Sequence, residues 1–159
     1  MKKAYIVEIL KDKDGFMKLN KKKELGNIED YTMSTYVDMV YFLDKELNLS
    51  KQINEYMYVM GFDLQQHLLG VMEVAHGTEN NLNCSMRDIF GALVLMRASR
   101  FIVAHNHVDG NSDSSEQDRN FTNKLLYAST IMDIELINHL IVGEKDFAYI
   151  MDANTKEVK

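Results

Sequence analysis

Two histidines separated by one residue, followed at a fixed distance by a serine and an aspartate, occupy the middle of this chain. His105 and His107 come directly after the apolar run 101–104, and Ser115 and Asp118 stand where helical periodicity begins. A short strand, a polar loop and a helix start must therefore meet at one place. Residues i and i+2 of a strand point to the same side, so both imidazoles can be directed at one point. A carboxylate in the first helical turn is stabilised there by the helix dipole.

These residue types suit a zinc ion. His105, His107 and Asp118 offer two imidazoles and one carboxylate, and three protein ligands leave a fourth position for water, as in catalytic zinc sites. Zinc lowers the pKa of bound water to about 7 and polarises a carbonyl group. The sequence therefore predicts a metal-dependent hydrolase with one zinc ion per chain.

Hydrolysis would need two further groups, a donor for the oxyanion and a general base for the water. Ser115, three residues before Asp118, is a plausible donor because it lies on the same edge of the expected helix. The base should be a carboxylate that reaches in from elsewhere in the chain. Glu55 and Glu73, at the ends of expected strands, are the two candidates.

Composition limits the class of protein. A chain of 159 residues can form one domain with a sizeable core, and 46% hydrophobic with 26% charged residues is ordinary for a soluble protein. The net charge of −6 argues against holding nucleic acid by overall charge, although residues 21–23 are three consecutive lysines. Cys84 is the single cysteine, which fits a reducing cytoplasm. We expect no signal peptide and no membrane span.

Hydrophobic periodicity predicts an α/β protein in which helices pack on a sheet of mixed strand direction. The expected strands are 4–10, 16–19, 56–63, 68–74, 101–105, 134–142 and 147–151, and the expected helices are 28–48, a segment that starts at Ser85, and 115–132. Asn27, with Asp30 three residues later, is the expected cap of the first helix. Residues 1–50 are expected to be a small N-terminal addition packed on the core.

The site pattern resembles a known family. H-x-H-x(7)-S-x(2)-D with a distant upstream Glu is similar to the JAMM motif, also called JAB or MPN+, of metal-dependent isopeptidases. An ordered series of shorter motifs over about residues 52–151 resembles the bacterial RadC-like branch of that superfamily. In this chain they stand as Glu55-Tyr56-Met57, Gly77-Thr78-Glu79-Asn80, Arg87-Asp88-Ile89-Phe90, His105-Asn106-His107-Val108-Asp109-Gly110, Ser115-Glu116-Gln117-Asp118 and Asn138-His139-Leu140-Ile141-Val142-Gly143.

The resemblance implies a fold and a role for each site residue. The fold would be the JAB1/MPN fold, similar in core layout to cytidine deaminases, over residues 51–152. His105, His107 and Asp118 would be the zinc ligands, and Ser115 would stabilise the oxyanion. Glu55 would be the general acid/base that activates the zinc-bound water. The substrate would be a peptide or another amide.

Some residues depart from the family pattern. The family's H-N-H-P-S-G is H-N-H-V-D-G here, which affects loop stiffness and leaves the ligands in place, and Asn138 replaces an aspartate. We expect no helix-hairpin-helix segment in residues 1–50, which removes the most direct sequence argument for DNA binding. His139 is expected to be a hydrogen-bonded core residue, with a supporting role behind the metal left open. His67 and His76 are not expected to be ligands.

Two other functions are alternatives to hydrolysis. The first is an accessory RadC-like protein in DNA repair or mobile-element biology that acts through contacts with a protein partner. The second is a deaminase, which the sequence excludes because that chemistry needs a P-C-x-x-C ligand pair and this chain has one cysteine and no proline.

Overall fold

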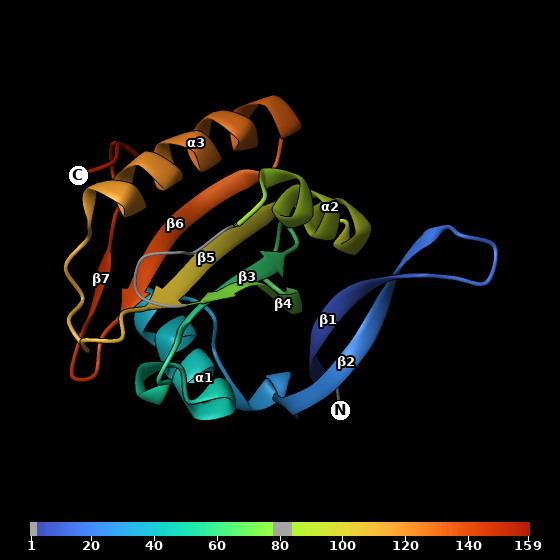
Figure 1. Ribbon diagram of the computed structural model, residues 1–159, viewed down its shortest axis with the longest axis horizontal. Coiled ribbons are helices and arrows are strands. Elements are labelled where there is room, and N and C mark those ends of the chain that lie inside the picture. Colours follow the sequence, from blue (N-terminus) through green and yellow to red (C-terminus); the bar gives the residue numbers. More distant parts are fainter. Residues whose placement is uncertain (1–2, 78–83) are drawn as a thin grey trace.

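The strands of the protein lie side by side in one mixed sheet, in the order β2-β1-β4-β3-β5-β6-β7 (Figure 1). The computed structural model describes residues 3–77 and 84–159. In chain order the elements are β1 (Lys3–Lys11), β2 (Met17–Asn27), the short 3₁₀ turn η1 (Ile28–Asp30), α1 (Tyr36–Leu47), η2 (Leu49–Lys51), β3 (Glu55–Phe62), β4 (Leu68–Gly77), α2 (Met86–Met96), β5 (Arg100–Asn106), α3 (Glu116–Met132), β6 (Glu135–Val142) and β7 (Phe147–Tyr149).

Two strand pairs are parallel and the others are antiparallel. β1 runs parallel to β4, and β5 runs parallel to β6. A parallel pair needs a long crossover, and α3 provides it between β5 and β6. The predicted α/β class with a mixed sheet and flanking helices is therefore confirmed.

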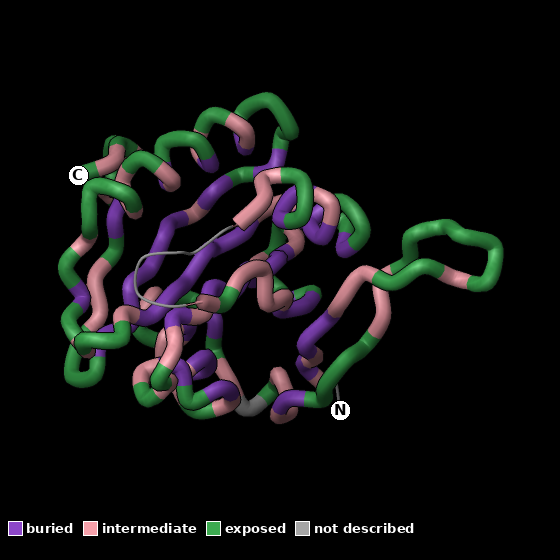
Figure 2. The backbone as a smooth tube through the Cα atoms, viewed as in Figure 1, coloured by how far each residue is buried: buried purple, intermediate pink, exposed green. Residues whose placement is uncertain are grey.

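The sheet separates two hydrophobic cores. On one face α1 packs through Met39, Phe42 and Leu43, and on the other face α2 and α3 pack through residues that include Leu93 and Leu125. The central strands are buried on both faces, as Figure 2 shows for the middle of the sheet. The apolar run before the histidines is typical of such a strand.

The first strands extend the same sheet and then leave the body of the molecule. β1 pairs with β4 at Ile6 and Val71, whereas the far end of the β1–β2 hairpin projects away from the domain (Figure 1). Phe16 at that end is 71% exposed. The division of the chain near residue 50 stays a prediction. None of the helices in the described part of the chain combines the length and apolar character that crossing a bilayer requires.

The predicted start of the first helix was wrong. Residues 28–30 form only a 3₁₀ turn, and α1 begins at Tyr36. Thr35 caps α1, because its hydroxyl accepts from the backbone N–H of Asp38 while the Asp38 carboxylate accepts from the backbone N–H of Thr35. Asn27 is instead the last residue of β2 and pairs with Lys3, so its backbone is extended.

Removal of the Thr35 hydroxyl tests this cap. We expect Thr35→Ala to lower the free energy of unfolding by about 1 kcal/mol, since one backbone N–H of the first turn loses its acceptor. Thr35→Ser keeps the hydroxyl and should stay close to the unmodified protein. Urea denaturation of the three proteins measures the difference, and equal losses in both variants would contradict the assignment.

Candidate metal centre

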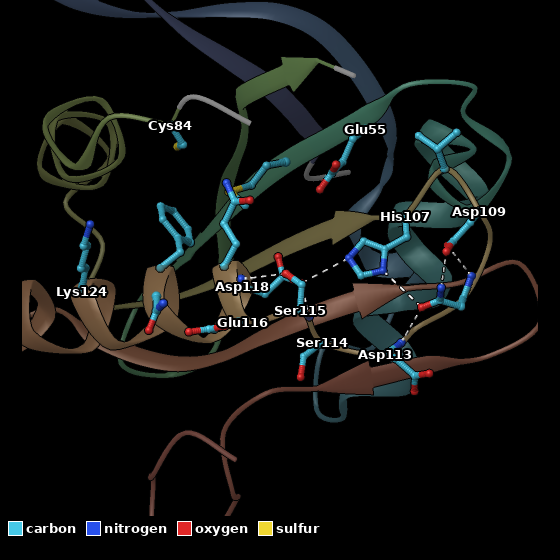
Figure 3. A pocket seen from close by; sticks show the side chains of 16 residues that line it. Glu55, Cys84, His107, Asp109, Asp113, Ser114, Ser115, Glu116, Asp118 and Lys124 are labelled. Carbon is cyan, nitrogen blue, oxygen red and sulfur yellow. Dashed lines mark hydrogen bonds and ion pairs between the residues drawn. The ribbon is translucent and has the colours of Figure 1, made fainter. Parts of the chain in front are cut away.

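The two histidines of the motif lie where β5 ends against α3. His105 is fully buried and belongs to β5, and it follows Phe101 and Val103 on the face covered by α2 and α3. His107 is the first residue beyond the strand, and its side chain is 17% exposed. Figure 3 shows His107 at the wall of a groove, with Asp118 approaching from the first turn of α3.

The side-chain atoms of four predicted site residues converge. The Nε2 atoms of His105 and His107 are 3.1 Å apart. The Asp118 carboxylate contacts both imidazoles, at 3.2 Å from His105 Nε2 and 3.3 Å from His107 Nε2. Glu55, at the start of β3, places Oε1 at 3.8 Å from His105 Nε2. The register of the sheet explains this approach, because Met57 of β3 lies opposite His105 of β5.

Two overlapping sets of ligands fit this geometry. Glu55, His105 and His107 each offer a ligand atom, and these atoms all lie within 4.8 Å of one another. Asp118 lies outside that group but is the carboxylate in direct contact with both imidazoles. Imidazole nitrogens with carboxylate oxygens are a donor set that suits zinc, so the chemistry of these residues fits the predicted ion. Which carboxylate serves as the third ligand stays a prediction.

The charges at the site favour a cation. Burial lowers the pKa of His105 below its usual value. Contact with Asp118 raises the pKa of His107. Burial alone would raise the pKa of the Asp118 carboxyl, but its contacts with the two imidazoles and with the Ser115 backbone N–H outweigh burial and hold that pKa well below its usual range. An ionised carboxylate therefore stands next to a neutral buried imidazole, and both present electron pairs.

Ser115 and Asp118 form the cap of α3. The Ser115 hydroxyl donates to Asp118 Oδ2 at 2.7 Å and accepts from the Asp118 backbone N–H at 3.0 Å. The Ser115 backbone N–H also donates to Oδ2, at 2.8 Å. This capping box fixes the carboxylate that faces the imidazoles. The role of Ser115 towards an oxyanion stays a prediction.

Only one of the two carboxylates proposed as the base lies at the imidazoles. Glu55 is buried at the site, whereas Glu73 is on β4, where its Oε1 lies 3.2 Å from His76 Nδ1. Glu73 faces a separate hollow beside β1 and α2. Sequence spacing could not separate these candidates, since both stand near the ends of the strands expected from the sequence, although β4 in fact continues beyond Glu73 to Gly77.

Asn106 holds the backbone on both sides of Glu55. Its Oδ1 accepts from the Tyr56 N–H at 2.8 Å, and its Nδ2 donates to the Asn54 carbonyl at 3.0 Å. Asn106 is almost fully buried, so these bonds form away from water. The residue between the two histidines therefore fixes the backbone of the segment that carries the acidic side chain.

The loop after His107 is fastened to the turn between β6 and β7. The Glu144 N–H donates to the Gly110 carbonyl at 2.8 Å, and the Ser112 hydroxyl donates to Asp146 Oδ1 at 2.8 Å. A Cβ at Gly143 would lie only 2.8 Å from the Gly110 carbonyl oxygen. Glycine at position 143 thus permits the close approach that holds the loop beside the site.

The site opens into a groove of about 890 Å³ along α3. Met57, Val108 and Phe121 give it apolar walls, and Lys124 supplies a cation at some distance from the imidazoles (Figure 3). Cys84 also lines the groove, but burial, with a smaller contribution from Asp88, raises the pKa of its thiol to about 12. The protonated thiol is therefore a poor ligand and a poor nucleophile.

Comparison with known proteins identifies the family. The model of the RadC-like JAB domain matches residues 33–156, so the chain belongs to the RadC-like JAB domain family. Part of one family motif, Thr78-Glu79-Asn80, lies outside the described residues.

Curated relatives carry only a family-level name. A UPF0758 protein of Trichodesmium erythraeum is 38% identical over 96 residues, which are 60% of this chain and 40% of the relative. A UPF0758 protein of Legionella pneumophila is 31% identical over 139 residues, which are 87% of this chain and 57% of the relative. The chain thus spans about half the length of these relatives.

Gly143→Ala tests whether the loop contact supports the site. The added methyl group must push the Gly110 carbonyl away, so we expect zinc affinity to fall about tenfold, as for other groups that orient metal ligands. Gly91→Ala is the matched control, because its Cβ would meet only Ile9 at an ordinary 3.8 Å. Zinc affinity is measured by competition with a chelator, and equal affinities in the two folded variants would contradict the role of the loop.

Proposed function

We propose that the protein is a zinc-dependent hydrolase of peptide or isopeptide bonds. The observation that carries the proposal is the convergence of two imidazole Nε2 atoms, the Asp118 carboxylate and the Glu55 carboxylate at the head of a groove. Membership of the RadC-like JAB domain family supports the same chemistry.

His105, His107 and Asp118 would hold the ion. Bound there, zinc would supply a Lewis acid for the amide carbonyl and lower the pKa of a water molecule. The chain contributes geometry, since β5 and the residue that follows it present the imidazoles, and the α3 cap fixes the carboxylate before any ligand arrives. Such preorganisation lowers the reorganisation needed at the moment of reaction.

Glu55 would act as the general acid/base. Its carboxylate lies 3.8 Å from His105 Nε2, close enough to take a proton from water held between it and the imidazoles. The same carboxyl would then give the proton to the leaving nitrogen. Ser115, which is exposed at the helix start, could turn its hydroxyl from Asp118 towards the developing oxyanion. The apolar walls of the groove would hold the substrate chain.

Metal content is the first test. We expect about one zinc ion per chain by mass spectrometry of the purified protein, because the donor set is complete. His107→Ala removes an imidazole that faces the site and should lose the zinc. Absence of zinc from the unmodified protein, even after incubation with the ion, would overturn the proposal and leave the accessory role in protein contacts as the remaining prediction.

Glu55→Gln separates a base from a ligand. If Glu55 is the base, the variant keeps its zinc, while metal-dependent hydrolysis of a peptide and isopeptide library falls by about 10²–10⁴-fold. Loss of zinc in Glu55→Gln would instead assign Glu55 to the ligand set. Unchanged hydrolysis would contradict both roles. Glu73→Gln is the matched control, since Glu73 lies in the other hollow.

Zinc should also stabilise the fold. A ligand that binds only the native state at a hundred times its Kd adds about 2.7 kcal/mol to the free energy of unfolding. We therefore expect the thermal midpoint to rise with added zinc in the unmodified protein and not in His107→Ala. An equal rise in both proteins would indicate that zinc binds elsewhere.

A further inference from the structure

A buried chain of hydrogen bonds runs behind His105, on the side away from the groove. His105 Nδ1 lies 2.8 Å from Nε2 of His139 on β6. His139 Nδ1 lies 2.7 Å from the Thr122 hydroxyl on α3, and that hydroxyl lies 2.7 Å from the Asp118 carbonyl oxygen. All three residues whose side chains form this chain of hydrogen bonds are fully buried: His105, His139 and Thr122.

The carbonyl at the end of this chain decides where the protons lie. A carbonyl oxygen can only accept, so the single proton of the Thr122 hydroxyl points to the Asp118 carbonyl. The hydroxyl oxygen must then accept from His139, which places a proton on His139 Nδ1. Asp118 thus fixes the tautomer of a histidine on another element through its backbone.

The same reasoning continues to the metal centre. His139 has no exposed surface, and burial away from water favours the neutral form of an imidazole. A neutral His139 with its proton on Nδ1 can only accept at Nε2, so the proton of His105 lies on Nδ1. His105 Nε2 then carries a lone pair, and that atom faces the Asp118 carboxylate and the His107 imidazole.

We propose that Thr122 and His139 are positioning residues that hold His105 in the Nδ1–H tautomer, which keeps its Nε2 available as a metal ligand. The inference rests on the proposed zinc site and is independent of the proposed hydrolysis. It extends the set of functional residues from the motif on β5 and α3 to β6, and it gives a role to a histidine that the motif does not contain.

His107 is held in a different way, which provides an internal comparison. Its Nδ1 lies 3.5 Å from Asn111 Oδ1, a long contact in an exposed loop. Hydrogen bonds therefore fix the ring orientation and tautomer of His105 before a metal binds, whereas the His107 ring can still reorient. Loss of the Asn111 contact should matter less than loss of the Thr122 hydroxyl.

Thr122→Val removes the hydroxyl at nearly constant shape. His139 Nδ1 then has no acceptor, and His139 gains by moving its proton to Nε2 and donating to His105 Nδ1. That reversal puts an N–H on His105 Nε2, aimed at the ligand position. We expect zinc affinity, measured by chelator competition, to fall about 10–100-fold in Thr122→Val and to stay within about threefold in Thr122→Ser, which keeps the hydroxyl.

The tautomers are read directly by two-bond ¹H–¹⁵N NMR of the metal-free protein with ¹⁵N-labelled histidine. In the unmodified protein and in Thr122→Ser, we expect the protons of His105 and His139 on Nδ1. In Thr122→Val, we expect His139 to carry its proton on Nε2. This spectrum of the unmodified protein needs no substitution, so the test stands even if a variant folds poorly.

Three outcomes would overturn the proposal. They are an Nε2–H tautomer of His139 in the unmodified protein, undiminished zinc affinity in Thr122→Val, and equal losses in the Val and Ser variants. Failure of hydrolysis in a protein that binds zinc and shows the Nδ1–H tautomers would count only against the proposed function.

Discussion

The site depends on one constraint: the buried imidazole of His105 has a partner at each of its two nitrogens. His105 has no exposed surface, and a polar group taken out of water must find partners on each side. The strand order places β3 on one side of β5 and β6 on the other. β3 therefore delivers Glu55 towards Nε2, and β6 delivers His139 to Nδ1. The sheet registers thus determine the site as much as the motif does.

The two halves of the motif follow from the elements that carry them. The spacing of His105 and His107 is the period of a strand, so both rings reach the same side of the sheet. The spacing of Ser115 and Asp118 is that of a helix capping box, in which residues N-cap and N3 bond to each other. Asp118 accordingly has two roles, because the carboxylate that caps the start of α3 also faces both imidazoles. Stability of α3 and charge at the site are coupled through this one side chain.

Local patterns predicted from the sequence agree with the structure where the governing contacts are local. The buried strand before His105 and the helix after Ser115 depend on near neighbours, and both lie where periodicity placed them. The predicted start of the first helix was wrong because the Asn27 side chain makes no capping hydrogen bond, whereas the Thr35 hydroxyl accepts from the backbone N–H of Asp38. Which of Glu55 and Glu73 lies at the imidazoles depends on the register between strands, which spacing along the sequence does not encode. The hydrogen bond of His139 depends on Thr122, a partner 17 residues away on another element.

Asn138 links the N-terminal part of the chain to the candidate metal centre. The family pattern has an aspartate there, but this side chain uses both halves of an amide. Its Oδ1 accepts from the backbone N–H groups of His139 and Met151, and its Nδ2 donates to the Met151 carbonyl and to the Tyr36 hydroxyl. A carboxylate could not donate to that carbonyl. Neighbouring residues of a strand face opposite sides of the sheet, so Asn138 and His139 of β6 point in opposite directions. Asn138 bonds to Tyr36 at the start of α1, while His139 bonds to the His105 imidazole on the other face. Helix α1, which lies within the first 50 residues, thereby supports β6, the strand whose His139 bonds to His105.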